Sequence, residues 1–241
     1  MKKPAPDLSR KDTLSMLSHD LKAPMTVIHS YADLLLEMMP EMGDEGKDIL
    51  GRIKGAAVKY SRLLDDFVTL SAVESGRLSL DLKPGSLSEV AASSADDLMV
   101  LANAKNVTIH TELPCDLPDV HIDEMHTGRV IGNVLANAIK YSQDGGRVWV
   151  RAGMDEKDKG KVFVEVMDEG PGIPEEDIPR VTEAYYRAEG HGKREGAGLG
   201  LAIVKVLTEL HGGSVEIKNK ADRGASVRIT LPAAGPETPS A

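Results

Sequence analysis

Asn133-Val134-Leu135-Ala136-Asn137-Ala138-Ile139-Lys140-Tyr141-Ser142 is the stretch of this 241-residue chain that most constrains its fold. Apolar residues from Val130 to Ala138 recur at helical spacing and predict a helix over about residues 125–139. Asn133 and Asn137 stand four residues apart, so their amides project from one face of that helix. Amide oxygens suit Mg²⁺, which prefers oxygen ligands, and the Lys140 ammonium could meet phosphate oxygens. From this segment alone, it is equally possible that the two asparagines only cap a helix or lie on its surface and bind no ligand.

The patterns on both sides of this helix indicate the fold class of the C-terminal part. Apolar residues at every second position predict strands at residues 107–111, 148–150, 162–166, 215–217 and 227–231. A capping box of Ser86 and Glu89 predicts a helix that reaches about Ala104. A further helix runs from Leu199 to His211, where Gly212-Gly213 stops it. The order predicts an α+β sandwich over residues 84–233, with helices on one face of a mixed sheet. Pro84-Gly85 marks its boundary, and residues 234–241 read as a disordered tail.

A second polar segment, Asp168-Glu169-Gly170-Pro171-Gly172-Ile173-Pro174, directly follows a predicted strand. A carboxylate at a strand end can accept a hydrogen bond from an amino group. Gly170 and Gly172 would let a ligand ring approach the backbone closely. An ordinary Gly-Pro turn is the alternative.

A third segment, Gly196-Ala197-Gly198-Leu199-Gly200-Leu201, opens the predicted helix 199–211. Its exposed backbone N–H groups and the positive end of the helix dipole favour phosphate. The segment is not a Walker A loop, because no Gly-Lys-Ser/Thr follows, and the motifs of eukaryotic protein kinases are missing. Residues 175–195, polar and long, would suit a lid over a nucleotide.

The N-terminal part predicts a helical hairpin. Residues 9–75 read as two long helices whose apolar residues recur at alternating steps of about 3 and 4, typical of a helical bundle. Pro40, Gly43 and Gly46 make residues 40–46 a turn, so the helices are expected to be antiparallel. One hairpin leaves an apolar face open, and pairing with a second copy would give a dimeric four-helix bundle over residues 9–76.

The segment Ser18-His19-Asp20-Leu21-Lys22-Ala23-Pro24 lies in the first of these helices. On a helical wheel His19 lies away from the apolar seam, so we expect it to face solvent. A largely neutral imidazole is a competent nucleophile for phosphorus, and Asp20 could take or orient its other proton. Pro24 should kink the helix nearby. A plain surface histidine is the alternative for His19 taken alone.

Together these segments resemble the sensor histidine kinases of two-component systems. Ser18 to Pro24 resembles the H-box, Asn133 to Ser142 the N-box, Asp168 to Pro174 the G1 box and Gly196 to Leu201 the G2 box. Val181 to Arg187 is a weaker match to the F-box, and Gly212-Gly213 and Gly224 resemble the closing glycines. The resemblance covers residues 9–233.

The resemblance implies ATP and Mg²⁺ as cofactors and a Bergerat-type ATP-binding domain. It implies His19 as phosphoacceptor, Asp20 as its proton partner, Asn137 as the Mg²⁺ ligand and Asp168 as acceptor for the adenine amino group. The other residues it assigns to the nucleotide site are Asn133, Lys140, Tyr141, Gly170, Gly172, Arg187, Gly196, Gly198, Leu199 and Gly200. It further implies homodimers that pass the phosphoryl group to the receiver domain of a response regulator.

Three positions depart from the family pattern. Ala23 stands four residues after His19, where many relatives have Thr or Asn, so we expect weak phosphatase activity toward the partner. In the F-box, Thr182 replaces the usual Phe and Ala184 replaces a usual Arg. These changes put in doubt whether the expected lid, residues 175–195, docks as it does in the family. Arg187 is kept where a basic residue is expected.

Composition narrows the alternatives. The formal net charge of -9 argues against nucleic acid as a partner. No apolar run is long enough to span a membrane and no signal peptide is evident. A single cysteine, Cys115, fits a reducing cytoplasm. We therefore expect a cytoplasmic kinase or the cytoplasmic part of a membrane receptor. Two alternative functions remain. One is an ATPase of the same fold, which would need a residue with a carboxylate in place of Asn133. The other is a degenerate kinase that acts only as a scaffold.

Overall fold

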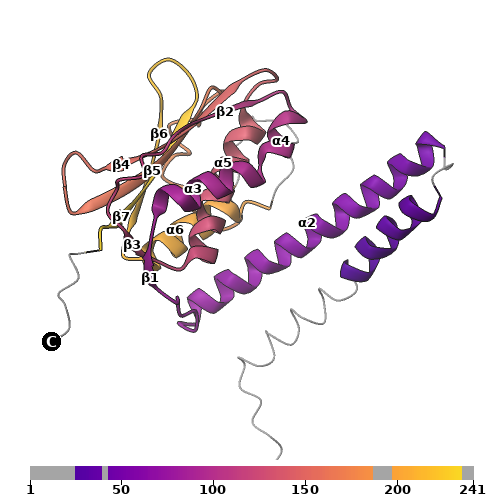
Figure 1. Ribbon diagram of the computed structural model, residues 1–241, viewed down its shortest axis with the longest axis horizontal. Helices are drawn as coiled ribbons and strands as arrows, with labels where there is room; N and C mark the ends of the chain where they lie inside the picture. Colours follow the sequence, from indigo (N-terminus) through magenta and orange to yellow (C-terminus); the bar gives the residue numbers. More distant parts are fainter. Residues whose placement is uncertain (1–24, 40–42, 187–196, 235–241) are drawn as a thin grey trace, which may run out of the picture. The chain divides into compact units, whose positions relative to one another are not determined.

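A computed structural model describes residues 25–39, 43–186 and 197–234 of the chain. The chain folds as two units, Met1–Leu78 and Ser79–Ala241. Figure 1 shows the first unit as helices in indigo and purple and the second as a sheet with covering helices. Among the described residues, no helix is both long and apolar enough to cross a membrane.

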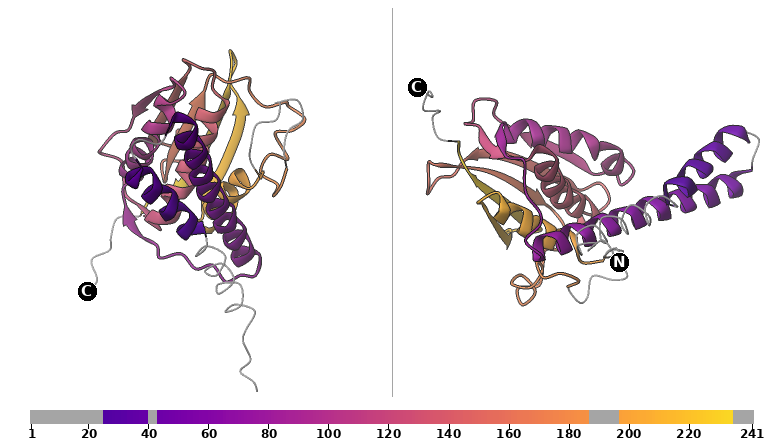
Figure 2. Two further views of the ribbon diagram at one scale, coloured as in Figure 1. Left: turned by 90° about the vertical axis from the view of Figure 1, so that its right-hand side faces the viewer. Right: turned by 90° about the horizontal axis from the view of Figure 1, so that it is seen from below.

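The first unit is the predicted helical hairpin. Residues 25–38 are helical, and helix α2 spans Asp44–Glu74. The two helices lie side by side in both figures (Figures 1 and 2), and the Lys54 ammonium lies 2.7 Å from the Asp33 carboxylate across them. Part of the segment predicted as a turn, 40–46, is helical, because α2 already begins at Asp44. Asp44 and Glu45 occupy its first turn, where the helix dipole stabilises negative charge.

A large apolar surface of the hairpin is exposed in the single chain. Between the helices, Ala32 is 2% exposed and Ala57 is 3% exposed. Large apolar side chains elsewhere on the hairpin are exposed, namely Val27, Tyr31, Leu34, Met38, Ile49, Ile53 and Phe67. The predicted end of the second helix is confirmed: Ser75 is the C-cap of α2, and Gly76 follows with a φ of 64°.

The second unit is built around a five-stranded mixed sheet. Its elements are β1 (Lys83–Gly85), α3 (Leu87–Asp97), α4 (Met99–Asn103), β2 (Thr108–Glu112), β3 (Val120–Ile122), α5 (Glu124–Tyr141), β4 (Arg147–Met154), β5 (Lys161–Asp168), α6 (Gly200–Leu210), β6 (Ser214–Asn219) and β7 (Ala225–Pro232). The strand order is β2-β4-β5-β7-β6, in which β2 pairs parallel to β4 and the other pairs are antiparallel. Strands β1 and β3 form a separate two-stranded sheet. The predicted α+β sandwich with a mixed sheet is confirmed.

Alternation along the strands gives the sheet one apolar face. Val148 and Val150 of β4 and Val162, Val164 and Val166 of β5 are at most 2% exposed. Burial of a valine side chain contributes about 1.5–3 kcal/mol, so these rows hold the helices on the sheet. Helices α3, α5 and α6 pack on this face (Figures 1 and 2). Residues of the opposite face, such as Trp149 and Phe163, are only half-buried.

Helix α5 is fixed at both of its ends. At its start, Asp123 is the N-cap, and its Oδ1 accepts from His126 N at 3.1 Å. Burial acts to raise the pKa of Asp123, but hydrogen bonds from His126 N and Asp81 N hold that pKa below its usual range. At its end, the Lys105 ammonium donates to the carbonyls of Ile139, Lys140 and Ser142 at 2.8, 2.5 and 2.7 Å. A cation at a helix C-terminus also interacts favourably with the helix dipole.

Three expectations about this unit need correction. The helix expected from Ser86 to Ala104 is confirmed at its N-cap, where the Ser86 hydroxyl accepts from Glu89 N at 3.2 Å, but it breaks at Leu98 into α3 and α4. Pro84 and Gly85 lie in strand β1, which is the first element of the second unit and was not expected as a strand. The expected tail starts one residue too early, because Ala234 N donates to Asp119 O at 2.7 Å. Residues 235–241 lie outside the described residues.

Candidate functional site

The two asparagines of α5 lie beside the first turn of α6. A Cβ at Gly200, the first residue of α6, would lie 3.8 Å from Asn137 Nδ2 and 4.0 Å from Asn133 Cγ. The predicted common face of Asn133 and Asn137 is thus directed at the start of a second helix, where a glycine leaves room for their amides.

The start of α6 has the features of an anion site. Its N-cap residue, Leu199, provides no side-chain cap, so the first backbone N–H groups of the helix have no side-chain acceptor there. Close by, the Asn133 Nδ2 is buried and has no hydrogen-bond partner among the described residues. Such an orphan donor is expected where a ligand or water completes the site. Leu199 itself is 4% exposed and belongs to the core, so only its backbone could meet a ligand.

Asp168 is the last residue of β5 and opens what we call the carboxylate turn, residues 168–173. Its side chain is buried, and its Oδ1 accepts from Gly170 N at 2.7 Å and from Ala225 N at 3.3 Å. Burial raises the pKa of Asp168, while these two hydrogen bonds and the Lys220 ammonium partly oppose that rise. Both hydrogen bonds use Oδ1 of Asp168. Among the described residues no donor engages its Oδ2, so this oxygen can accept a hydrogen bond from a ligand.

The glycines of the carboxylate turn permit close approaches to neighbouring elements. A Cβ at Gly170 would lie 2.9 Å from the Tyr141 carbonyl oxygen, so the turn packs against the end of α5. Gly172 has a φ of 80°, which favours glycine. Tyr141 therefore links the two segments, since it ends the helix that carries Asn133 and Asn137. The Lys140 ammonium lies 5.0 Å from the centre of the Tyr141 ring.

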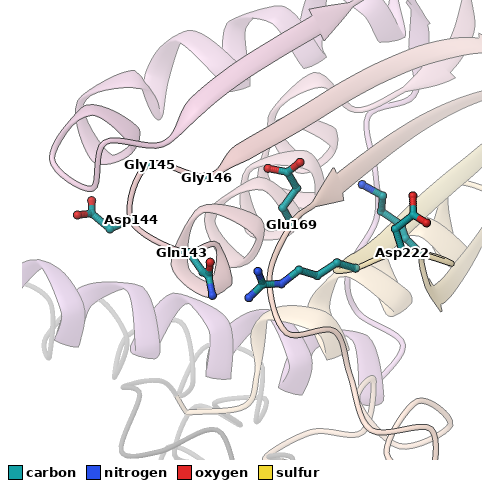
Figure 3. Close-up of a pocket in the computed structure, with 8 residues that line it drawn as sticks. Gln143, Asp144, Gly145, Gly146, Glu169 and Asp222 are labelled. Atoms are coloured by element: carbon teal, nitrogen blue, oxygen red, sulfur yellow. The ribbon is translucent and has the colours of Figure 1, made fainter.

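A pocket of about 340 Å³ opens beside the carboxylate turn (Figure 3). Its walls come from the α5–β4 loop, the end of β5 and the β6–β7 connection, and comprise Gln143, Asp144, Gly145, Gly146, Glu169, Lys220, Asp222 and Arg223. Glu169 is held by Arg147, whose Nη2 lies 2.7 Å from Oε1. Neither Asn133 nor Asn137 lines this pocket as described, so it extends the carboxylate side of the site and not the amide side.

Several predicted site residues lie outside the described residues: His19, Asp20, Ala23, Arg187 and Gly196. Gly198 is described and has a φ of 74°. Its carbonyl accepts from Tyr185 N at 2.9 Å, so the segments that flank residues 187–196 are hydrogen-bonded to each other.

Sequence reasoning missed three contributors to this region. Lys105 fixes the end of α5, and Asn219 and Lys220 at the β6–β7 connection contact the carboxylate turn. A lone lysine or asparagine carries no motif, so no signal in the sequence could have singled these residues out. Near the weak F-box match, the Tyr186 hydroxyl donates to the buried Asp177, which was also unexpected.

Two family descriptions match the chain. The histidine kinase-, DNA gyrase B- and HSP90-like ATPase family matches residues 122–235, and the His Kinase A (phospho-acceptor) domain matches residues 9–76.

Individual relatives agree with these matches. The adaptive-response sensory kinase SasA of Rippkaea orientalis is 32% identical over 91% of this chain and 57% of SasA. The structure of the mycobacterial sensor histidine kinase MprB is 31% identical, with a TM-score of 0.55, over 63% of this chain and 97% of that chain. The crystal structure of full-length ShkA in complex with AMPPNP is 25% identical, with a TM-score of 0.75, over 95% of this chain and 47% of that chain.

The chain spans between 24% and 58% of the length of the curated relatives it matches. It covers nearly all of the MprB chain, however, and both family domains match it in the same order as the two units of the structure. On this basis the chain belongs to the sensor histidine kinases and carries their phosphoacceptor and ATP-binding domains.

Proposed function

We propose that this chain is a protein histidine kinase that uses ATP to phosphorylate His19 and then passes the phosphoryl group to an aspartate in the receiver domain of a response regulator. The observation that carries the proposal is the arrangement of the second unit. The amides of Asn133 and Asn137 lie against the uncapped start of α6, and a buried carboxylate follows at the end of β5.

The carboxylate turn supports recognition of an adenine base. The exocyclic amino group of adenine is a donor, and Asp168 Oδ2 is an acceptor whose partner oxygen is already engaged by two backbone N–H groups. Gly170 and Gly172 let the turn pack against the Tyr141 carbonyl and the Asn219 amide, where an added Cβ would lie 2.9 Å from the oxygen of each, so the turn is held in place beside the carboxylate. The AMPPNP complex of ShkA, an ATP analogue complex, agrees with this ligand class.

The start of α6 supports binding of the phosphates. Free N–H groups at a helix N-terminus attract anions, and Lys140 supplies a cation at the end of α5. Mg²⁺ fits the donor set, because the Asn137 amide offers a neutral oxygen and Gly200 leaves space beside it. Bound Mg²⁺ would neutralise phosphate charge, with Asn133 adjacent. Arg187, Gly196 and Gly198 complete the proposed phosphate side.

The chemistry proposed for His19 is nucleophilic phosphoryl transfer. A neutral ring nitrogen attacks the γ-phosphorus, the N–P bond forms, and the bond to the β–γ bridging oxygen breaks so that ADP leaves with the electron pair. Asp20 holds or accepts the proton on the other ring nitrogen. In the second step an aspartate oxygen of the receiver domain attacks phosphorus, and the imidazole leaves.

The exposed apolar surface of the helical hairpin supports a homodimer. Large apolar side chains are left uncovered on residues 25–39 and α2, and a second copy would bury them as a four-helix bundle. Light scattering of the purified chain checks this assignment, since a monomer at micromolar concentration would contradict it.

Incubation with γ-labelled ATP tests the kinase proposal. We expect acid-labile, base-stable label on the native chain and none on His19→Gln. Label on both proteins would place the phosphoryl group elsewhere. Release of labelled phosphate without labelled protein would favour the simple ATPase. Transfer is then tested by adding purified receiver domains to the labelled chain and following loss of its label.

A further inference from the structure

The connection between β6 and β7 closes over the carboxylate turn, and one of its side chains has no role so far. Asn219 is the last residue of β6, 46 positions from Ile173 in the sequence. We propose that Asn219 is a positioning residue for the purine nucleotide, which holds the carboxylate turn in its binding conformation. This inference rests on the proposed function.

Asn219 binds the backbone of the turn with both ends of its amide. Its Oδ1 accepts from Ile173 N at 2.8 Å, and its Nδ2 donates to Ile173 O at 2.7 Å. The same oxygen lies where a Cβ on Gly172 would approach to 2.9 Å. One amide therefore engages both backbone groups of Ile173 and leaves no room beside it for a Cβ on Gly172.

The turn needs such a brace because it has no regular secondary structure of its own. Residues 169–174 belong to no helix or strand, so the N–H and C=O of Ile173 have no ladder partner. An asparagine side chain ends in a planar amide that has a donor and an acceptor, as a peptide group has. It can therefore supply both hydrogen bonds that a neighbouring strand would give to one residue.

The two ends of the carboxylate turn are held by the same connection. At the start of the turn, Ala225 N donates to Asp168 Oδ1, and the Lys220 ammonium donates to the Asp168 carbonyl at 3.4 Å. At its end, Asn219 holds Ile173. The β6–β7 connection therefore sets the distance between the buried carboxylate and the far end of the carboxylate turn at Ile173.

Asn219 is exposed, so its hydrogen bonds contribute modestly to the stability of the fold. Their effect on binding is larger, because a turn that is ordered before binding does not lose entropy on binding. We expect Asn219→Ala to weaken nucleotide binding about tenfold while the thermal midpoint of the second unit falls by no more than about 3 °C.

The experiment measures the dissociation constant of ATP with Mg²⁺ by calorimetry on the full chain, together with KM and kcat for autophosphorylation. Asn219→Ala should raise Kd and KM together and leave kcat unchanged. Asn219→Ser can satisfy only one of the two Ile173 groups and should be intermediate. Asn219→Asp keeps the acceptor but places a carboxylate against the Ile173 carbonyl, so it should bind no better than Asn219→Ala.

Asn103→Ala is the matched control, since Asn103 is exposed at the end of α4. It should change neither Kd nor KM. If native protein binds ATP and Asn219→Ala binds equally well, the positioning role is wrong and the proposed function stands. If native protein binds no ATP, both are overturned. If the loss of affinity in the three variants follows their loss of thermal stability, Asn219 has a structural role only and the inference fails.

Discussion

Gly224 allows the β6–β7 connection to approach β5, and replacing it with alanine should be severely destabilising. Its φ is 92°, in the left-handed region. A Cβ there would overlap the Asp168 carbonyl oxygen and lie 2.6 Å from the carbonyl carbon. The strained backbone costs about 1–2 kcal/mol. Relief of the clash must move the connection outward, which breaks the hydrogen bond from Ala225 N to the Asp168 carboxylate, a loss of about 1.5–3 kcal/mol.

We therefore expect Gly224→Ala to lower the free energy of unfolding of the second unit by about 2.5–5 kcal/mol, or about 10 °C in thermal midpoint for a unit of this size. Gly145→Ala is the control, because Gly145 has a similar φ of 74° but nothing within 4 Å of its Cβ position. It should cost only the backbone strain of about 1–2 kcal/mol.

Tryptophan emission provides the assay, because the single tryptophan, Trp149, lies on β4 and reports on the second unit. Urea titration of both variants and the native chain gives the two differences directly. Equal losses in Gly224→Ala and Gly145→Ala would refute the reasoning, since the close approach to Asp168 would then carry no cost beyond backbone strain.

Three other changes have defined outcomes. Lys105→Met should destabilise the second unit by about 2–3 kcal/mol in the same urea assay, because three carbonyls at the end of α5 lose a charged donor, whereas Lys157→Met at an exposed turn should be neutral. In Asp168→Asn the side-chain amide oxygen can still accept the hydrogen bonds from Gly170 N and Ala225 N, but the side chain cannot ionise. Since burial raises the pKa of Asp168, its stabilising contribution is present below its unfolded pKa and is lost as pH rises through its folded pKa. The stability of Asp168→Asn relative to native should therefore increase as the pH rises above about 4, and a flat difference would contradict this. Ala23→Thr should raise phosphatase activity toward a phosphorylated receiver domain in the presence of ADP, because Ala23 offers no group to position water; strong activity in the native chain would contradict that reasoning.

The long periodic elements could be predicted from the sequence because each pattern is local. Helix α5 and strands β4 and β5 lie where the spacing of their valines and leucines indicated, and the stop at Gly76 follows from the left-handed conformation that glycine tolerates. The break at Leu98 was missed because apolar spacing continues through it. Asp96 and Asp97 place negative charge at the C-terminus of α3, which the helix dipole disfavours.

Tertiary contacts account for what the sequence did not reveal. Strands β1 and β3 have three residues each, too few for any alternation to show, and they exist because they pair with each other. In the candidate site, the segments with Asn133, Asn137 and Asp168 were predicted as chemically important, whereas the brace from Asn219 was not. Its partner is 46 residues away, and only the folded sheet brings the two together.

The strand order has a consequence for how the protein is made. Strand β7 follows the other strands of its sheet in the sequence but lies between β5 and β6, and the residues where β6 leads into β7 hold both ends of the carboxylate turn. During synthesis this turn therefore cannot be organised until the β6–β7 hairpin has left the ribosome exit tunnel. The nucleotide site that we propose therefore forms later in synthesis than the helical hairpin, whose residues precede it in the sequence.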